Sequence, residues 1–290
     1  FFTKLLLREL CYFWQMNKQP IAVFDSGYGG LTVLKEITAL LPQYDYLYLG
    51  DNSRAPYGNK SYATVYEYTL EAVKWFFAKG CPLVILACNT ASAKALRTIQ
   101  QNDLPKIAPQ KRVLGVIRPT AEVIGNFSQT GHVGVMGTTG TVESSSYILE
   151  IQKKFPQLSV TQEACPLWVP IIENNEQHSP EAENIIEKNV KNLWHKDDQI
   201  DTILLACTHY PLIAGQILKY TPKNVQLISQ GKIVAESLLN YLQRQQQIEQ
   251  QCSKNQQLEF YTTGDVKDFD SHATLFYGQP VAAKHTDLKL

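Results

Sequence analysis

The sequence of 290 residues has no excess charge of either sign, because Lys and Arg together number 27 and Asp and Glu together also number 27. A chain without net charge has no overall electrostatic attraction to nucleic acid or to an anionic membrane. No run of apolar residues reaches the roughly 18 residues of a membrane-spanning helix. We therefore expect neither a nucleic-acid nor a membrane partner, and any anion must be bound by a local site.

Motifs that would indicate several other chemistries are also missing. The six cysteines include no Cys-x-x-Cys, so neither a zinc ribbon nor a thioredoxin-type site is predicted. Their wide spacing favours reduced thiols over disulfides. The glycine-rich stretch at residues 25–30 does not match Gly-x-Gly-x-x-Gly, and no P-loop lysine follows it, so a nucleotide site is not predicted.

The first fifteen residues differ in character from those that follow. Bulky apolar residues are interrupted by Lys4, Arg8 and Glu9, and no small-residue cleavage site of a signal peptide is present. We interpret residues 1–15 as an upstream or vector-derived leader in preference to a natural regulatory extension. The functional protein is then expected to start at Met16.

From Pro20 onward, short apolar runs alternate with helical patterns. A strand is expected at residues 21–24 ahead of a helix at 31–41, and another strand at 83–87 ahead of a helix at 90–101. Further strands are expected at 46–49, 112–116, 132–136, 158–161, 202–206, 225–228 and 258–261, a long helix at 61–79, and an exposed, Gln-rich helix end and loop at 243–257. This alternation is typical of βαβ units and predicts an α/β fold with mainly parallel sheets.

One pattern occurs twice, far apart in the chain. An apolar strand followed by Ala-Cys and then by polar residues is found at 85–90 and again at 204–209. Two pseudo-symmetric α/β domains would each place a cysteine, Cys88 or Cys207, at the carboxyl end of a strand. Ligands of open α/β sheets bind beyond those ends, so the two thiols would lie on either side of a cleft between the domains.

Two thiols facing one ligand suit the inversion of a stereocentre by proton transfer, which needs a base on one face and an acid on the other. The N-terminus of a helix after each strand would lower the pKa of the cysteine and favour a thiolate. Most free cysteines are simply small buried hydrophobes. The polar residues that follow Cys88 and Cys207 favour a chemical role, whereas the structural interpretation stands for Cys11, Cys81, Cys165 and Cys252.

Other polar residues lie at similar positions. Asp25 and Ser26 end the first expected strand, although Ser26 could serve only as a helix cap. The turn at 137–141, which contains Thr138, offers hydroxyls and amides that suit a carboxylate. His209 stands beside Cys207 and could assist proton transfer. The loop at 51–58 could reach the cleft or be a surface connection.

Taken together, these segments resemble the glutamate racemases of the aspartate/glutamate racemase superfamily. The matching stretches, in family order, are residues 24–27, 29–31, 50–51, 56–58, 87–91, 137–138, 165–167 and 207–211. His209 discriminates within the superfamily, since aspartate racemases tend to have an acidic residue at that position.

The resemblance implies an isomerase of two α/β domains with its active site in the cleft between them, the first formed by residues 16–112 plus 222–290 and the second by 113–221. It implies racemisation of glutamate without pyridoxal phosphate, metal or other cofactor, in the bacterial cytoplasm, supplying D-glutamate for peptidoglycan. It leaves open whether a cell-wall precursor activates the enzyme and whether the chain forms a homodimer.

The resemblance also implies roles for individual residues. Cys88 would deprotonate D-glutamate with Asp25 beside it, and Cys207 would deprotonate L-glutamate with His209 beside it. Glu173 matches an acidic residue near that histidine. The residues implied in binding the amino and carboxylate groups are Asp25, Ser26, Tyr57, Gly58, Asn89, Thr90, Thr138, Thr208 and His209.

The chain departs from the family pattern at Tyr28, Ser53, Ala206 and the segments 118–120 and 229–231. These differences concern regulation and domain packing, because none includes either cysteine. Two alternatives differ in function: a related racemase acting on aspartate or a hydantoin, and a non-catalytic amino-acid-binding protein. Binding alone does not need two thiols, which argues against the second.

Overall fold

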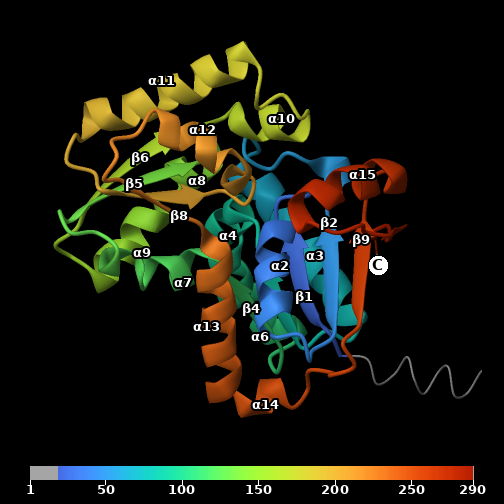
Figure 1. Cartoon of the computed structure of the whole chain (residues 1–290). Helices are drawn as coiled ribbons and strands as arrows, with labels where there is room; N and C mark the ends of the chain where they lie inside the picture. The colour runs from blue at the N-terminus through green and yellow to red at the C-terminus, as the bar shows by residue number, and fades with distance from the viewer. Residues whose placement is uncertain (1–18, 290) are drawn as a thin grey trace, which may run out of the picture.

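The computed structural model describes residues 19–289 and consists of two α/β units, each built on its own sheet of parallel strands (Figure 1). All the strand pairs found among the described residues are parallel. The expected α/β class with mainly parallel sheets is confirmed. The leader expected at residues 1–15 and the start at Met16 lie outside the described residues.

The first sheet has the order β10-β9-β2-β1-β3-β4. Its strands are β1 (Ile21–Asp25), β2 (Tyr46–Gly50), β3 (Leu83–Leu86), β4 (Arg112–Gly115), β9 (Leu258–Thr262) and β10 (Ala283–His285). The central strand β1 is buried along its whole length, with Ile21 and Val23 in one core and Ala22 and Phe24 in another. Helices therefore cover both faces, which explains why residues 21–24 of β1 form a continuous apolar run.

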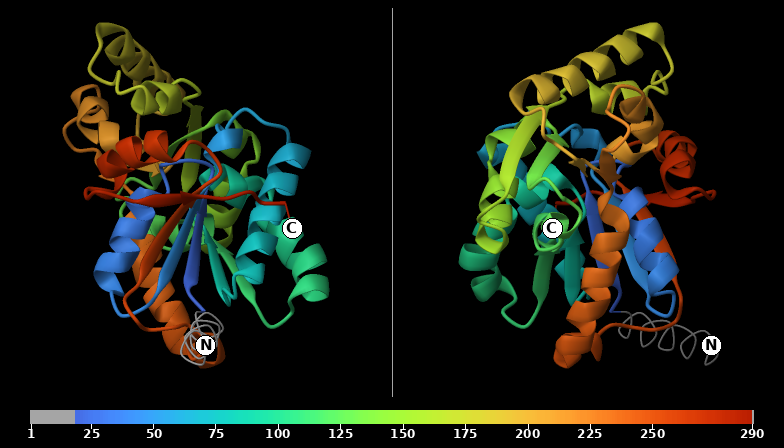
Figure 2. Two further views of the ribbon diagram at one scale, coloured as in Figure 1. Left: turned by 90° about the vertical axis from the view of Figure 1, so that its right-hand side faces the viewer. Right: turned by 60° about the vertical axis from the view of Figure 1, so that its left-hand side comes forward.

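Helices of the first unit form two layers. On the Val23 face lie α2 (Leu31–Leu40), α13 (Gln230–Arg244) and α15 (Val266–Tyr277), and on the Phe24 face lies α3 (Tyr62–Ala78). Beside α3, the chain continues through α4 (Asn89–Lys94), α5 (Leu96–Thr98), a π-helical segment (Ile99–Asp103) and α6 (Leu104–Ile107). The last residues return to the α3 face, where Leu288 is buried (Figure 2).

The second sheet has the order β6-β5-β7-β8, formed by β5 (His132–Gly137), β6 (Ser159–Ala164), β7 (Thr202–Ala206) and β8 (Gln226–Ile228). Its helices are α7 (Ile117–Ala121), α8 (Thr139–Glu143), α9 (Ser146–Lys154), α10 (Trp168–Glu173), α11 (Pro180–Lys196) and α12 (Ala214–Lys219). Figure 1 shows α11 and α12 on one side of this sheet and α7 and α9 on the other.

The chain crosses between the sheets twice. It leaves the first sheet only after β4, which pairs with β3, and leaves the second only after β8, which pairs with β7. The domain limits expected at residues 113 and 222 therefore fall inside β4 and ahead of β8. By strand pairing, β4 belongs to the first sheet and β8 to the second. Each crossing between the sheets therefore comes a few residues after the expected domain limit.

Three local features differ from the sequence-based expectations. The helix expected at residues 90–101 is divided among α4, α5 and the π-helical segment, ahead of Pro105 in α6. Strand β10 was not expected. The Gln-rich segment is not uniformly exposed, because it forms α14 (Gln246–Glu249) and buries Ile248 and Cys252 in the core. These two residues, four apart, are apolar anchors within an otherwise polar stretch.

Cys81, Cys88, Cys165, Cys207 and Cys252 are free and buried. The preference for reduced thiols is confirmed for these five, and Cys11 lies outside the described residues. No helix within residues 19–289 combines the length and apolarity required to cross a membrane.

Candidate active site

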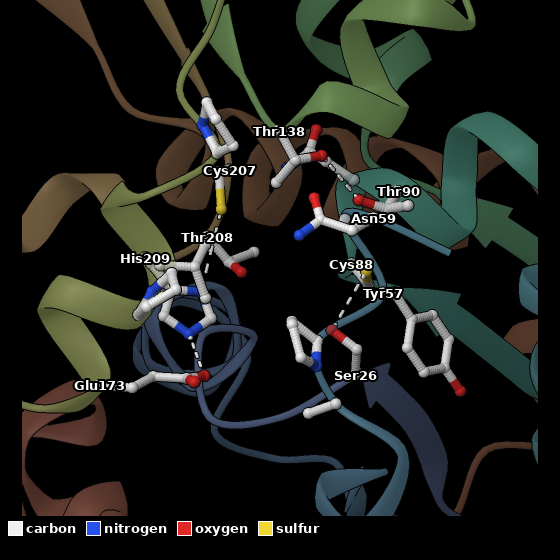
Figure 3. A pocket seen from close by; sticks show the side chains of 17 residues that line it. Ser26, Tyr57, Asn59, Cys88, Thr90, Thr138, Glu173, Cys207, Thr208 and His209 are labelled. Atoms are coloured by element: carbon white, nitrogen blue, oxygen red, sulfur yellow. Dashed lines mark hydrogen bonds and ion pairs between the residues drawn. The ribbon is translucent and has the colours of Figure 1, made fainter. Parts of the chain in front are cut away.

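A pocket lies where the carboxyl ends of the two sheets face each other (Figure 3). Within each sheet the strand register aligns the carboxyl ends of neighbouring strands: Asp25 of β1 lies opposite Gly50 of β2, and Gly137 of β5 lies opposite Ala206 of β7. The pocket contains about 580 Å³ of space, part of it open to solvent. Its walls are formed by Ser26, Ala55, Pro56, Tyr57, Gly58, Asn59, Cys88, Asn89, Thr90, Thr138, Pro166, Val169, Pro170, Glu173, Cys207, Thr208 and His209.

Cys88 enters the pocket from the first unit, two residues after the end of β3 and as the N-cap of α4. The backbone N–H of Ala91 donates to its sulfur at 3.4 Å, and its thiol donates to Ser26 Oγ at 3.6 Å. Burial raises the pKa of Cys88 to about 12, and the negative charge of Asp25 adds to this shift. Our expectation of a lowered pKa is wrong for Cys88, because burial outweighs the N–H of Ala91. At neutral pH this residue is a thiol.

Cys207 enters from the second unit, at the end of β7, and takes part in a chain of three side chains. Its sulfur lies 3.8 Å from His209 Nδ1, and His209 Nε2 lies 2.9 Å from Glu173 Oε1. Burial alone would lower the pKa of His209, but hydrogen bonds to Cys207 and Glu173, together with their charges, raise it to about 10. The imidazole beside Cys207 is therefore protonated at neutral pH.

Asp25 is the one predicted site residue that does not line the pocket. It is 1% exposed and lies behind Ser26, where the N–H of Gly27 donates to Oδ2 at 3.0 Å and Thr208 Oγ1 donates to Oδ1 at 3.4 Å. Burial raises the pKa of Asp25, and the nearby charge of His209 opposes this shift. Asp25 thus connects the turn after β1 with the turn that carries Thr208 and His209.

Gly29 allows these two turns to approach closely. A Cβ atom at this position would lie 2.3 Å from Thr208 Oγ1 and 2.4 Å from His209 Nδ1. Phe276 of α15 packs edge-on against the His209 ring at 5.1 Å. Tyr28 stacks on Phe276 and donates to Asp268 at 2.5 Å, so this departure from the family pattern docks α15 beside the site.

Threonine hydroxyls from both units meet in the pocket. Thr90 Oγ1 of α4 lies 2.9 Å from Thr138 Oγ1, which follows β5. Thr138 caps α8 by accepting from the N–H of Thr141 at 3.3 Å. With Ser26 and Thr208, these hydroxyls provide donors for carboxylate oxygens.

Two predicted binding residues have side chains with other partners. The Tyr57 hydroxyl donates to Asp51, and in Figure 3 it points away from the two thiols. The Asn89 amide donates to Gln230 Oε1 at 2.6 Å and accepts from the Tyr147 hydroxyl at 2.5 Å. Tyr57 therefore presents its ring and backbone to the pocket, and Asn89 has only part of its amide free for a ligand.

Six wall residues were not among the predicted site residues: Ala55, Pro56, Asn59, Pro166, Val169 and Pro170. Ala55 and Pro56 belong to the loop at 51–58 that was expected either to reach the cleft or to be a surface connection. Asn59 directly follows the matched segment 56–58, and Pro166 belongs to the matched segment 165–167. Val169 precedes Glu173 by four residues in α10, so helical spacing could have placed it on the same face. Within residues 19–289, no group of three or more His, Cys, Asp or Glu side chains could hold a metal ion.

Comparison with known proteins gives consistent similarities. Residues 30–238 match the family described as Asp/Glu/Hydantoin racemase. The chain is 36% identical over 277 residues to a glutamate racemase of Streptococcus thermophilus, covering 94% of this chain and 97% of that protein. It is 38% identical over 265 residues to a glutamate racemase of Enterococcus faecalis, covering 90% and 93%.

Two solved structures share the fold closely. The glutamate racemase RacE1 of Bacillus anthracis has a TM-score of 0.84 at 32% identity, with 94% of this chain and 98% of that chain covered. The glutamate racemase of Francisella tularensis, solved in complex with D-glutamate, has a TM-score of 0.83 at 32% identity and the same coverage.

Proposed function

The chain belongs to the Asp/Glu/hydantoin racemase family, and from this premise we propose that it interconverts L-glutamate and D-glutamate by proton transfer through Cys88 and Cys207. One observation carries the proposal: two buried thiols, one from each α/β unit, line a single pocket. Each thiol also has its own supporting groups, Ser26 for Cys88 and His209 with Glu173 for Cys207.

In the direction from L- to D-glutamate, Cys207 removes the Cα proton while Cys88 supplies a proton to the opposite face. The Cα–H bond breaks toward the Cys207 sulfur, and a new Cα–H bond forms with the proton of the Cys88 thiol. Cys88 is left as a thiolate and Cys207 as a thiol, and exchange with solvent restores the starting state. The high pKa of Cys88 suits it to begin as the acid.

In the direction from D- to L-glutamate the roles reverse, so Cys88 must become a thiolate. The ammonium group of a bound substrate would favour this form, because a nearby positive charge lowers a thiol pKa. Imidazolium His209 would stabilise negative charge that develops at Cys207. We propose that Asp25 acts from behind the wall, through its charge and its hydrogen bond from Thr208.

Substrate carboxylates would be bound by hydroxyl and amide donors of the pocket. Ser26, Thr90, Thr138 and Thr208 supply hydroxyls from both units, and Asn89 supplies its free amide N–H. The backbone of Tyr57 and Gly58 lies on the same wall. Donors from both units would fix the substrate between the thiols, since proton transfer needs the reacting atoms at near-contact distance.

Glutamate is favoured over aspartate or a hydantoin because the compared relatives with 36% and 38% identity are glutamate racemases. We propose that the D-glutamate formed feeds peptidoglycan synthesis in the bacterial cytoplasm. Restored growth of a D-glutamate-requiring bacterium that expresses this chain would support that role. Growth only in the presence of added D-glutamate would contradict it.

Circular dichroism of L-glutamate, L-aspartate and a hydantoin, each incubated with the protein without added cofactor, tests the substrate. Loss of optical activity with glutamate alone is expected, and faster racemisation of another substrate would overturn the choice. Dialysis against a chelator or addition of hydroxylamine should leave the rate unchanged. Loss of activity under either treatment would indicate a metal or a carbonyl cofactor.

The two-thiol mechanism is tested in heavy water. D-glutamate formed early from L-glutamate should carry deuterium at Cα, while the remaining L-glutamate stays largely protonated. Replacement of either Cys88 or Cys207 by Ala should abolish racemisation in both directions. Cys81→Ala is the matched control, because Cys81 is also buried but does not line the pocket. Rapid deuterium entry into unreacted L-glutamate would mean that a single base serves both faces.

A further inference from the structure

Three buried polar side chains close a ring of hydrogen bonds beside Cys88. Gln230 Nε2 donates to the Tyr147 hydroxyl at 2.6 Å, and the Tyr147 hydroxyl donates to Asn89 Oδ1 at 2.5 Å. Asn89 Nδ2 donates back to Gln230 Oε1 at 2.6 Å. All three side chains are at most 4% exposed, so water does not compete for these bonds.

The ring joins parts of the molecule that are distant in sequence. Asn89 directly follows Cys88 and starts α4, whereas Tyr147 belongs to α9 of the second unit. Gln230 starts α13, two residues after β8, where the chain has just returned to the first unit. The position of the turn that carries Cys88 is therefore tied to the second unit through these side chains.

Gln230 also reaches the other crossing between the units. Its Nε2 lies 3.3 Å from the carbonyl oxygen of Val116 and 3.1 Å from Thr120 Oγ1, and both groups follow β4. The segments 118–120 and 229–231 both depart from the family pattern, and here the two departures are in direct contact. Neither segment contributes a residue to the pocket wall.

The carbonyl of Val116 determines the direction of the ring. Side-chain amide oxygen and nitrogen have similar shapes, so by geometry alone the three hydrogen bonds could run in either sense. A backbone carbonyl can only accept, and therefore the nitrogen of Gln230 must face Val116. The oxygen of Gln230 then faces Asn89, which must present its nitrogen to Gln230 and its oxygen to Tyr147.

In this orientation, one N–H of the Asn89 side chain is not used within the ring. The amide nitrogen carries two hydrogens, of which Gln230 accepts one. Among the described residues the second N–H has no hydrogen-bond partner, and Asn89 lines the pocket in which a carboxylate would bind. A flipped amide would instead bring its oxygen toward the negatively charged group, which would repel it.

We propose that Gln230 and Tyr147 are positioning residues that hold the Asn89 amide with one N–H directed to a substrate carboxylate. The inference rests on the proposed racemisation of glutamate, because it assumes an anionic substrate in this pocket. Neither residue lines the pocket, so both act through Asn89.

The test uses Tyr147→Phe and Gln230→Met, which remove hydrogen-bonding groups with little change of shape. Each should raise the KM for both glutamate enantiomers roughly tenfold, the effect of about one lost hydrogen bond to a charged group, and change kcat by less than about threefold. Tyr46→Phe is the matched control, because its buried hydroxyl bonds to the Leu41 carbonyl away from the pocket. It should leave KM unchanged.

A double-mutant cycle separates positioning from a general structural role. Asn89→Ala should raise KM at least as much as either variant, and Tyr147→Phe or Gln230→Met should add nothing further in that background. Full additivity, or a KM within twofold of the unaltered protein for Tyr147→Phe, would overturn the proposal. Tyr147→Phe loses a single oxygen atom, so it keeps the test decisive if Gln230→Met fails to fold. Failure of the unaltered chain to racemise glutamate would instead overturn the proposed function.

Discussion

Nε2 of His209 lies 2.9 Å from Oε1 of Glu173, and this contact links the turn after β7 to the end of α10. The other ring nitrogen of His209 faces Cys207 at 3.8 Å. Burial opposes the positive charge on the imidazole, but both partners favour it and the pKa of His209 rises to about 10 from an ordinary 6.5. His209 and Glu173 therefore form an ion pair throughout the neutral pH range.

Glu173→Gln should lower the pKa of His209 toward its ordinary value, because the variant removes the charge that supports the imidazolium. In the unaltered protein, NMR of the His209 ring should show no titration between pH 6 and 8. In the variant, titration should begin within that range. Glu176→Gln is the control, since Glu176 is exposed on the same segment and forms no ion pair among the described residues. A His209 that titrates near pH 6.5 in the unaltered protein would contradict this prediction.

The same pair should make stability depend on pH. The pKa of His209 is higher in the folded protein than in the unfolded chain, so protonation of this residue favours the folded state. This contribution to stability is complete below about pH 6.5 and is lost as the pH rises toward 10. The difference in free energy of unfolding between the unaltered protein and Glu173→Gln should therefore shrink from pH 6 to pH 10. Denaturant titrations at intervals across this range measure it. A difference that grows with pH would show that the sign is wrong.

Cys88 should react slowly with iodoacetamide at pH 8, because the thiolate is the nucleophile and its pKa is raised to about 12. Burial is the main cause and the charge of Asp25 is the next. Asp25→Asn should therefore lower the pKa and speed alkylation of Cys88, as measured by peptide mass spectrometry. Cys81 is an internal control: its pKa is also about 12, but Asp25 does not contribute to it. Equal acceleration at both cysteines would indicate general loosening of the protein.

Gly29→Ala should impair catalysis without touching either thiol. The added Cβ would lie within 2.4 Å of Thr208 Oγ1 and His209 Nδ1, so the turn that carries them must move. Displacement by about 1 Å can cost on the order of a hundredfold in rate. Gly215→Ala is the matched control, since a Cβ added there in α12 would meet no atom within 4 Å apart from its chain neighbours and its own helix backbone. That helical site should gain stability by about 0.4–1 kcal/mol and keep full activity. Unchanged turnover in Gly29→Ala would contradict the close approach of the two turns.

Much of the fold is accessible from sequence because its strands carry strong local signals. The fully buried strands β1, β3 and β7 contain the continuous apolar runs 21–24, 83–86 and 203–206, and Cys88 and Cys207 come within two residues of the ends of β3 and β7. Strand β10 carries no such signal, since it has only three residues, Ala-Lys-His, and pairs at the sheet edge. Burial of Cys252 depends on packing against distant core residues, which a Gln-rich composition conceals.

The chemistry of the site depends more on tertiary contacts than the motifs suggest. The pKa of Cys88 is set by burial and by Asp25, which lies on a different strand, and these outweigh the helix N-terminus that sequence reasoning relied on. The contact of Gln230 with Thr120 joins residues that are 110 positions apart. Both residues belong to segments that depart from the family pattern, 118–120 and 229–231, but only the fold brings them together beside Asn89.

The division of labour between His209 and Asp25 should appear as direction-dependent kinetics. If His209 supports Cys207 as the base for L-glutamate, His209→Asn should lower kcat more from L to D than from D to L. If Asp25 supports Cys88, Asp25→Asn should show the opposite asymmetry. The larger losses should be on the order of the 10²–10⁴ typical of positioned acid–base groups.

These asymmetries are constrained by the substrate. Enantiomers have equal free energies in water, so any variant must keep equal kcat/KM values in the two directions. If a variant lowers kcat more for one enantiomer than for the other, the KM of that enantiomer must therefore fall by the same factor relative to the KM of the other. Initial rates from L- and D-glutamate, followed by circular dichroism, give both constants and check this internally. Equal losses of kcat in both directions for both variants would mean that Asp25 and His209 position the substrate jointly, since neither would then serve one thiol alone.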